Sequence, residues 1–270
     1  DVEYTGRTYH FDSSIYDRRV FDGFGKADPR AEIQFGPNIK DWPEMVPLTE
    51  DILLRVVSVI HDPVTTTDEL IPSGETSSYR SNPEALAQFA LSRKDPAYVG
   101  RAKEIREAEM IRRTNTCPMR ENQDVGDAFR AVKAVYPQLK ARATGIGTVI
   151  YAVKPGDGSA REQAASCQKV LGGWANIARE YATKRYRSNL INWGMIPFIW
   201  PEEELPFENL DFLFIPGIRT AIEQGAPQVT AYRIHQGELI PFALEIGEMT
   251  PDERQIILDG CLINYYKNNR

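Results

Sequence analysis

The residues in this sequence that could most directly do chemistry form the loop Gly156-Asp157-Gly158-Ser159-Ala160-Arg161-Glu162. A helical pattern begins where the loop ends, and the first turn of a helix presents unpaired backbone N–H groups and a partial positive charge. Gly156 and Gly158 let the backbone approach a ligand closely, and the planar guanidinium of Arg161 can bind a carboxylate through two hydrogen bonds. These residue types indicate an anion site, with Ser159 as the natural helix N-cap.

Two other interpretations of this loop have to be weighed. A capped helix with an exposed arginine would contain the same residues, and the loop alone does not separate that interpretation from an anion site. A phosphate-binding loop fits less well, because the sequence lacks the pattern GxxxxGK[ST]. Gly145-Ile146-Gly147 also lies inside an expected strand and has no third glycine.

Two apolar runs predict the strands that must position this loop. Residues 52–60 and 145–153 are rich in β-branched side chains and predict buried strands. The first run leads into a polar turn over residues 65–74, and the second leads directly into the loop. Beyond the loop, apolar residues three and four positions apart predict one continuing helix, and these are Ala164, Cys167, Leu171, Trp174, Ala178 and Tyr181.

The remaining segments mix helices and strands, which indicates an α/β or α+β protein. The last helix is well marked, because Thr250 is an N-cap, Pro251 takes the first position and Glu253 completes a capping box. The other expected elements are helices over 84–93, 97–113 and 125–136, a buried irregular connection over 190–199, and short strands over 212–215, 228–235 and 238–244.

The composition argues against several classes of protein. The 270 residues carry a net charge of -6, so a global basic surface for nucleic acid is missing. No apolar run approaches the about 20 residues that span a bilayer, so no membrane association is expected. Cys117, Cys167 and Cys261 are far apart without a CxxC pair, which predicts neither a disulfide framework nor a metal site in this chain.

The N-terminus predicts that the chain is a fragment of a larger protein. Asp1-Val2-Glu3-Tyr4 lacks an initiator Met and any signal-peptide pattern. Residues 1–48 predict an extended strap, anchored by Trp42 and Pro47, and residues 49–270 predict the domain proper. We expect a cytoplasmic protein, or a mitochondrial one if the source is eukaryotic.

A resemblance adds to this interpretation. Residues 158–165, Gly-Ser-Ala-Arg-Glu-Gln-Ala-Ala, are similar to the Gly-Ser-Ser-Arg-Glu-His-Ala signature of the aconitase and isopropylmalate isomerase superfamily. Upstream, Thr66-Thr67-Asp68, Gly74 and Arg80 resemble the family's Thr-Thr-Asp-His turn, its glycine and its substrate arginine. The resemblance covers roughly residues 50 to 200 and also includes Leu171-Gly172-Gly173, Ser188-Asn189-Leu190 and Gly194-Met195-Ile196-Pro197.

The resemblance implies the C-terminal swivel domain of an aconitase-type hydratase, with β/β/α layers in which helices flank a barrel-like mixed sheet. Such hydro-lyases add and remove water across a double bond of a small di- or tricarboxylate. By resemblance, Ser159 would be the catalytic base, Arg80 and Arg161 would bind substrate carboxylates, and Asp68 would orient one of these arginines. Ala160 replaces a serine that contacts substrate in the family, so the substrate itself is left open. The supporting residues implied are Thr67, Gly156, Gly158, Glu162 and Gln163.

The family's 4Fe-4S cluster is held by cysteines on other domains, so the resemblance implies that this chain binds none. Cluster-bearing N-terminal domains or a large subunit would be the partner, and the isolated chain would be inactive. Two alternatives remain: a stand-alone small subunit of an isopropylmalate-isomerase-like enzyme, and a non-catalytic RNA-binding relative. The net charge of -6 counts against RNA binding.

Overall fold

The computed structural model describes residues 6, 10–19, 23–114 and 117–269. It divides into two units, Asp1–Pro37 and Asn38–Arg270. The first unit contains one short exposed helix, α1 (Ser14–Arg19), within the segment for which an extended strap is expected. The predicted anchor residues belong to the second unit, where the ring of Trp42 lies 4.4 Å from that of Trp193.

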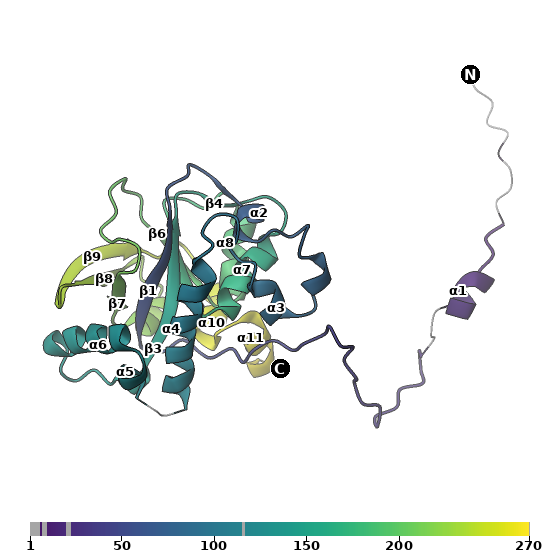
Figure 1. Ribbon diagram of the computed structural model, residues 1–270. Helices are drawn as coiled ribbons and strands as arrows, with labels where there is room; N and C mark the ends of the chain where they lie inside the picture. Colours follow the sequence, from purple (N-terminus) through teal and green to yellow (C-terminus); the bar gives the residue numbers. More distant parts are fainter. Residues whose placement is uncertain (1–5, 7–9, 20–22, 115–116, 270) are drawn as a thin grey trace, which may run out of the picture. The chain divides into compact units, whose positions relative to one another are not determined.

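The second unit is built on a closed barrel of seven strands, in the order β1-β3-β5-β6-β9-β8-β7 (Figure 1). The first four strands are parallel, and the last three are antiparallel and return to β1. The predicted fold class, a barrel-like mixed sheet flanked by helices, is therefore confirmed. The strands are β1 (Asp51–Ile60), β3 (Thr144–Ala152), β5 (Gly173–Ala178), β6 (Ile196–Ile199), β9 (Glu238–Glu245), β8 (Gln228–His235) and β7 (Phe212–Ile215).

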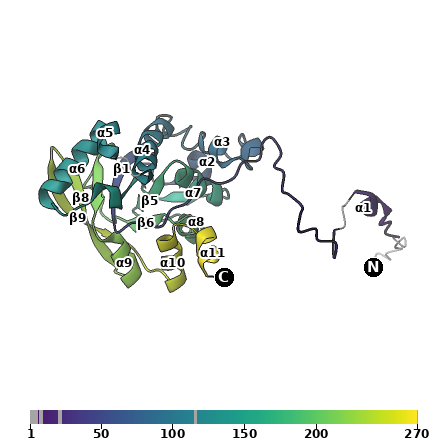
Figure 2. The ribbon, with the colours of Figure 1, turned by 90° about the horizontal axis from the view of Figure 1, so that it is seen from below.

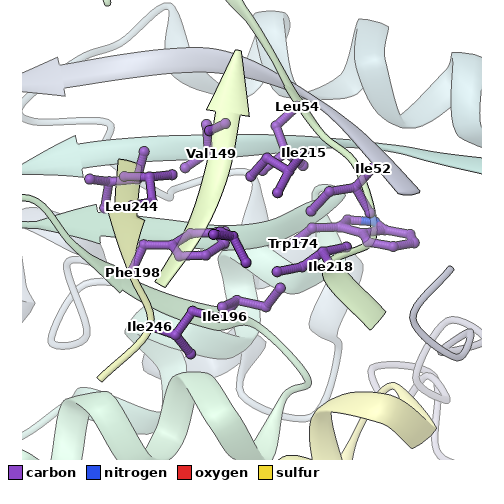
Figure 3. Packing of buried hydrophobic residues seen from close by; sticks show 14 of the residues in the cluster. Ile52, Leu54, Val149, Trp174, Ile196, Phe198, Ile215, Ile218, Leu244 and Ile246 are labelled. Carbon is purple, nitrogen blue, oxygen red and sulfur yellow. The ribbon is translucent and has the colours of Figure 1, made fainter. Parts of the chain in front are cut away.

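Side chains fill the interior of the barrel, so it is a packed core (Figure 3). Ile52 and Leu54 of β1 point inward, whereas Leu53 packs outside the barrel. The alternation continues along the strand, with Val56 in the interior and Val57 in the outer core, and the pairing with β3 shifts register between Val56 and Ser58. Burial on both faces explains why β1 and β3 read as continuous apolar runs.

Helices cover the barrel on opposite sides, with α3 and α4 on one side of the strands and α9 and α10 on the other (Figure 2). The capping box predicted at Thr250 and Glu253 opens α10 and is confirmed. The helices of this unit, apart from those introduced with the site, are α3 (Pro83–Ala87), α4 (Tyr98–Arg113), α5 (Pro118–Glu121), α6 (Gln123–Val135), η2 (Ala141–Ala143), α7 (Arg161–Val170), α8 (Lys184–Asn192), α9 (Ile218–Gln224), α10 (Pro251–Asp259) and α11 (Leu262–Asn268).

Three expectations about individual segments were wrong. The helix expected to continue through Tyr181 ends at Val170, because Gly172 adopts a left-handed conformation and the chain turns into β5. All six residues of β5 are buried, so the alternation of a strand is hidden and a helical spacing arises by coincidence. The irregular connection expected at 190–199 contains the end of α8 and strand β6, and the helix expected over 84–93 is limited to α3.

In the part of the chain that the structure describes, no helix is both long enough and apolar enough to cross a membrane.

Candidate active site

The two sequence blocks expected to share a site lie side by side in the structure. They follow β1 and β3, which are neighbouring parallel strands, so their carboxyl ends meet at the same edge of the barrel. Beyond that edge the chain forms a small parallel sheet of β2 (Thr65–Thr66) and β4 (Pro155–Asp157). The N–H of Thr65 donates to the carbonyl of Lys154 at 3.0 Å. Ligands of open α/β sheets commonly bind beyond the carboxyl ends of parallel strands.

The turn after β2 packs directly against the glycine loop. Helix α2 (Thr67–Leu70) begins with a capping box in which Thr66 and Glu69 satisfy each other's backbone N–H groups. Thr67 is buried, and a Cβ on Gly158 would overlap its hydroxyl oxygen. Gly158 also has φ +132°, a conformation that favours glycine. Both the close approach and the backbone angle therefore require glycine at this position.

Ser159 lies exposed just before α7, but it is not the helix N-cap that the sequence led us to expect. Ala160 takes that position and has no side chain that can cap the helix. Its φ and ψ of -83° and 42° place the helix start one residue later than expected. Among the described residues the Ser159 hydroxyl makes no hydrogen bond, so this nucleophilic group is free beside the N–H groups of the first turn of α7.

The first turn of α7 carries the other predicted loop residues. The Nε of Arg161 is buried and has no hydrogen-bond partner in the described chain. Glu162, in contrast, accepts a 3.1 Å hydrogen bond from the indole N–H of Trp193. Gln163 is half-buried, and its backbone carbonyl accepts a 3.5 Å hydrogen bond from the hydroxyl of Ser166. Of these three residues, Arg161 is the one with a buried side-chain nitrogen that has no hydrogen-bond partner in the described chain.

Helix α8 packs against the glycine loop through Tyr186, a residue that the sequence did not single out. The ring of Tyr186 packs against Gly156, where a Cβ would overlap it. The Tyr186 hydroxyl accepts hydrogen bonds from Gln168 at 2.9 Å and Asn176 at 2.8 Å, and all three side chains are buried. Burial raises the pKa of Tyr186 well above its ordinary value, so this hydroxyl stays neutral. In the sequence Tyr186 stands between Arg185 and Arg187, and this local pattern carries no signal of such a role.

Asp68 pairs with an arginine that was not predicted. The expectation was an ion pair with Arg80 or Arg161, but the Asp68 carboxylate lies 2.5 Å from a guanidinium nitrogen of Arg93. Arg80 is exposed and caps the short 3-10 helix η1 (Ser77–Tyr79). In the described part of the chain it has neither a hydrogen bond nor an ion pair. The structure thus places Thr67, Asp68, Gly158 and the loop together, and leaves Arg80 on the adjoining exposed segment.

The described side chains of this chain do not fit an iron–sulfur cluster. The three cysteines are unpaired, with Cys167 and Cys261 buried and Cys117 half-buried. Burial also raises the pKa of the Cys167 thiol, which disfavours the thiolate that a metal requires. Within the described residues no group of three or more His, Cys, Asp or Glu side chains is arranged to hold a metal ion.

The sequence is similar to known proteins over the segment that contains the loop. Residues 93–203 match the family described as the aconitase C-terminal domain, a range that includes the loop and begins after Asp68 and Arg80. The chain is 27% identical, over 97% of its length, to aconitate hydratase A of Corynebacterium efficiens, of which it covers 28%. It is 25% identical, over 80% of its length, to aconitate hydratase A of Rickettsia bellii, of which it covers 26%. The chain thus spans about a quarter of the length of these curated relatives.

Among solved structures, the chain is similar to 3-isopropylmalate dehydratase of Methanocaldococcus jannaschii. The TM-score is 0.48 at 24% sequence identity, and the match covers 81% of this chain and 95% of that one.

Proposed function

Because this chain carries the C-terminal swivel domain of the aconitase superfamily, we propose that it supplies the base and the carboxylate-binding groups of a hydro-lyase. The substrate would be a small di- or tricarboxylate, which gains or loses water across a carbon–carbon double bond. One observation carries the proposal: the unbonded hydroxyl of Ser159 and the buried, unpartnered Nε of Arg161 flank the start of α7. They lie beside the Thr67–Asp68 turn, from which the second half of the site comes.

Ser159 would remove the proton from the carbon next to a substrate carboxylate. A free serine hydroxyl is too weak an acid to ionise near neutral pH, so its oxygen needs nearby positive charge. The N-terminus of the ten-residue helix α7 supplies about half an elementary charge, and Arg161 adds a full one. The same groups stabilise the negative charge that develops on the substrate as the proton leaves.

Arg161 and Arg80 would hold substrate carboxylates, because neither is paired with a protein carboxylate among the described residues. Ala160 offers no hydroxyl, so this wall of the site favours a substrate that places an apolar group there. Asp68, Thr67, Gly156, Gly158, Glu162 and Gln163 would shape the loop and its surroundings.

This chain itself would carry out only the proton transfer and the binding of the substrate carboxylates. Its cysteines do not form a cluster site, so no step here runs through an iron–sulfur cluster. Removal of the hydroxyl would belong to other domains of the same polypeptide or to a separate large subunit.

The test is proton exchange at the carbon next to a carboxylate, followed by NMR in D2O with a panel of saturated and unsaturated di- and tricarboxylates. The complete enzyme should exchange this proton with at least one of them. Ser159→Ala should slow the exchange by about 10²- to 10⁴-fold, the usual contribution of a general base. Thr220→Ala removes a hydroxyl near Glu50, which precedes β1 at the opposite end of that strand, and should exchange normally. Unchanged exchange in Ser159→Ala would exclude Ser159 as the base.

A further inference from the structure

Two consecutive cations hold the acidic residues around the candidate site. Arg93 pairs with both Asp68 and Glu75, and Lys94 pairs with Asp62 at 2.7 Å and Glu69 at 3.3 Å. We call Arg93 and Lys94 the clamp. The carboxylates it holds come before, within and after the Thr65–Leu70 turn.

The backbone directs the clamp toward that turn. Leu91 is buried and has φ +54°, which is uncommon for a residue with a side chain. Its N–H donates to the carbonyl of Leu70 at 2.9 Å, and its own carbonyl accepts from the N–H groups of Lys94 and Asp95. This strained turn therefore joins the end of α2 to the two residues that bind the carboxylates of the turn.

Unlike the clamp, the cations of the proposed site are not paired with carboxylates among the described residues. Arg80 and Arg161 have no carboxylate partner in the described chain, although Asp68 and Glu75 belong to the same segment as Arg80. Arg80 follows Glu75 by five positions of turn and 3-10 helix, a rise of about 10 Å, which their long side chains can bridge. A free Glu75 would thus be a ready partner for Arg80.

These observations assign a role to the clamp, and the assignment rests on the proposed carboxylate site. We propose that Arg93 is a positioning residue that sequesters the Asp68 and Glu75 carboxylates and so keeps Arg80 unpaired for a carboxylate of the substrate. Arg93 itself binds no substrate. Lys94 does the same for Glu69 and Asp62. The pKa of Lys94 is raised, first by its hydrogen bond to Asp62, so its positive charge is retained.

The experiment measures how fast phenylglyoxal, a reagent for accessible guanidinium groups, modifies Arg80 in the full chain, with peptide mass mapping as the readout. In Arg93→Gln the freed Glu75 should pair with Arg80 and slow its modification by about two- to fivefold, as expected when a partly exposed ion pair must first open. Arg93→Gln combined with Glu75→Gln should restore the wild-type rate. Arg93→Lys, which keeps the charge, should also stay close to the wild type.

Two outcomes would overturn the inference. Equal modification of Arg80 in the wild type and in Arg93→Gln would show that Arg93 sequesters nothing that Arg80 can bind. A slower rate that neither Glu75→Gln nor Asp68→Asn reverses would mean that Arg93 acts only on the shape of the segment. Arg130→Gln breaks an exposed ion pair on α6 and is the matched control, with no expected effect.

A second arm separates this inference from the proposed function. Tricarballylate, a saturated tricarboxylate, should slow the modification of Arg80 and Arg161 in the wild type and should do so less in Arg93→Gln. Absence of any protection in the wild type would count against the proposed substrate class, whereas the mutant comparison without tricarballylate would still decide the role of the clamp.

Discussion

A side-chain carbon on Gly158 would overlap the hydroxyl oxygen of Thr67, so the two halves of the candidate site meet at these two residues. Their segments are about 90 residues apart in sequence and are joined here by the short sheet of β2 and β4. This contact fixes how far the glycine loop can move relative to the turn that carries Asp68. It therefore offers a direct way to disturb the site without touching Ser159 or Arg161.

We expect Gly158→Ala to lower the free energy of unfolding by about 1–3 kcal/mol, because alanine adds both the overlap with Thr67 and strain at a positive φ. Urea denaturation measures the change. Combination with Thr67→Ala should recover part of the loss, since it removes the hydroxyl overlap but leaves the strain and the 3.3 Å approach to the Cβ of residue 67. Gly74→Ala is the matched control, because a Cβ there meets no atom within 4 Å and the φ of Gly74 lies outside the range that favours glycine. Equal effects of the two glycine substitutions would contradict the packing described here.

Tyr186→Phe should destabilise the protein by about 1–3 kcal/mol, because it removes the buried acceptor of two amide hydrogen bonds and leaves Gln168 and Asn176 with fewer partners. Tyr266→Phe, at a tyrosine that is 57% exposed, should change the stability by less than about 0.5 kcal/mol. Chemical denaturation of the two variants side by side tests this. A stability of Tyr186→Phe equal to that of the wild type would show that the amides find other partners.

We expect the free energy of unfolding to depend on pH through Lys169. Burial lowers its pKa from 10.5 to about 8, and its ammonium lies 5.6 Å from the centre of the Trp174 ring. The unfolded chain therefore holds this proton up to a higher pH than the folded protein does. Between pH about 8 and 10.5 unfolding takes up a proton, so the contribution of Lys169 to stability rises with pH across this window.

Lys169→Met removes this contribution. Below pH 8 the variant should be more stable than the wild type by up to about 2 kcal/mol, and the advantage should shrink as the pH rises toward 10.5. Lys103→Met, at an exposed lysine of α4, controls for the general loss of a lysine. Denaturation curves at pH 7 and pH 10 give the comparison. An advantage that is constant between these two pH values would rule out the titration of Lys169 as its cause.

Trp42→Ala should weaken the attachment of the segment before β1. The ring of Trp42 packs at an angle of 43° against that of Trp193, whose indole N–H donates to Glu162 in the first turn of α7. We expect a loss of about 1–3 kcal/mol and a shift in the fluorescence of the remaining tryptophans. Phe35→Ala changes an exposed aromatic residue and should have little effect. Unaltered stability of Trp42→Ala would indicate that the ring contact contributes nothing to holding this segment.

The elements that could be predicted are those whose pattern is local. The β-branched runs that became β1 and β3, and the capping box at Thr250, depend on neighbouring residues and were recognised. The strand β5 was taken for a helix, because a strand buried on both faces has no alternation to reveal it. The change from α7 to β5 is marked by Gly172, whose left-handed conformation became visible in the structure.

In the candidate site, too, the features that depend on local sequence could be predicted and those that depend on tertiary contacts could not. The sequence by itself determined the chemical content of the loop: two glycines, a serine and an arginine at the start of a helix, all within seven consecutive residues. The tertiary structure alone decided that Asp68 pairs with Arg93, that Tyr186 supports Gly156, and that Ala160 rather than Ser159 occupies the N-cap position of α7. The physical reason is that the first set depends on covalent neighbours and local backbone angles. Most of the second set depends on which strands become neighbours in the barrel, and that choice is made by the packing of the whole core.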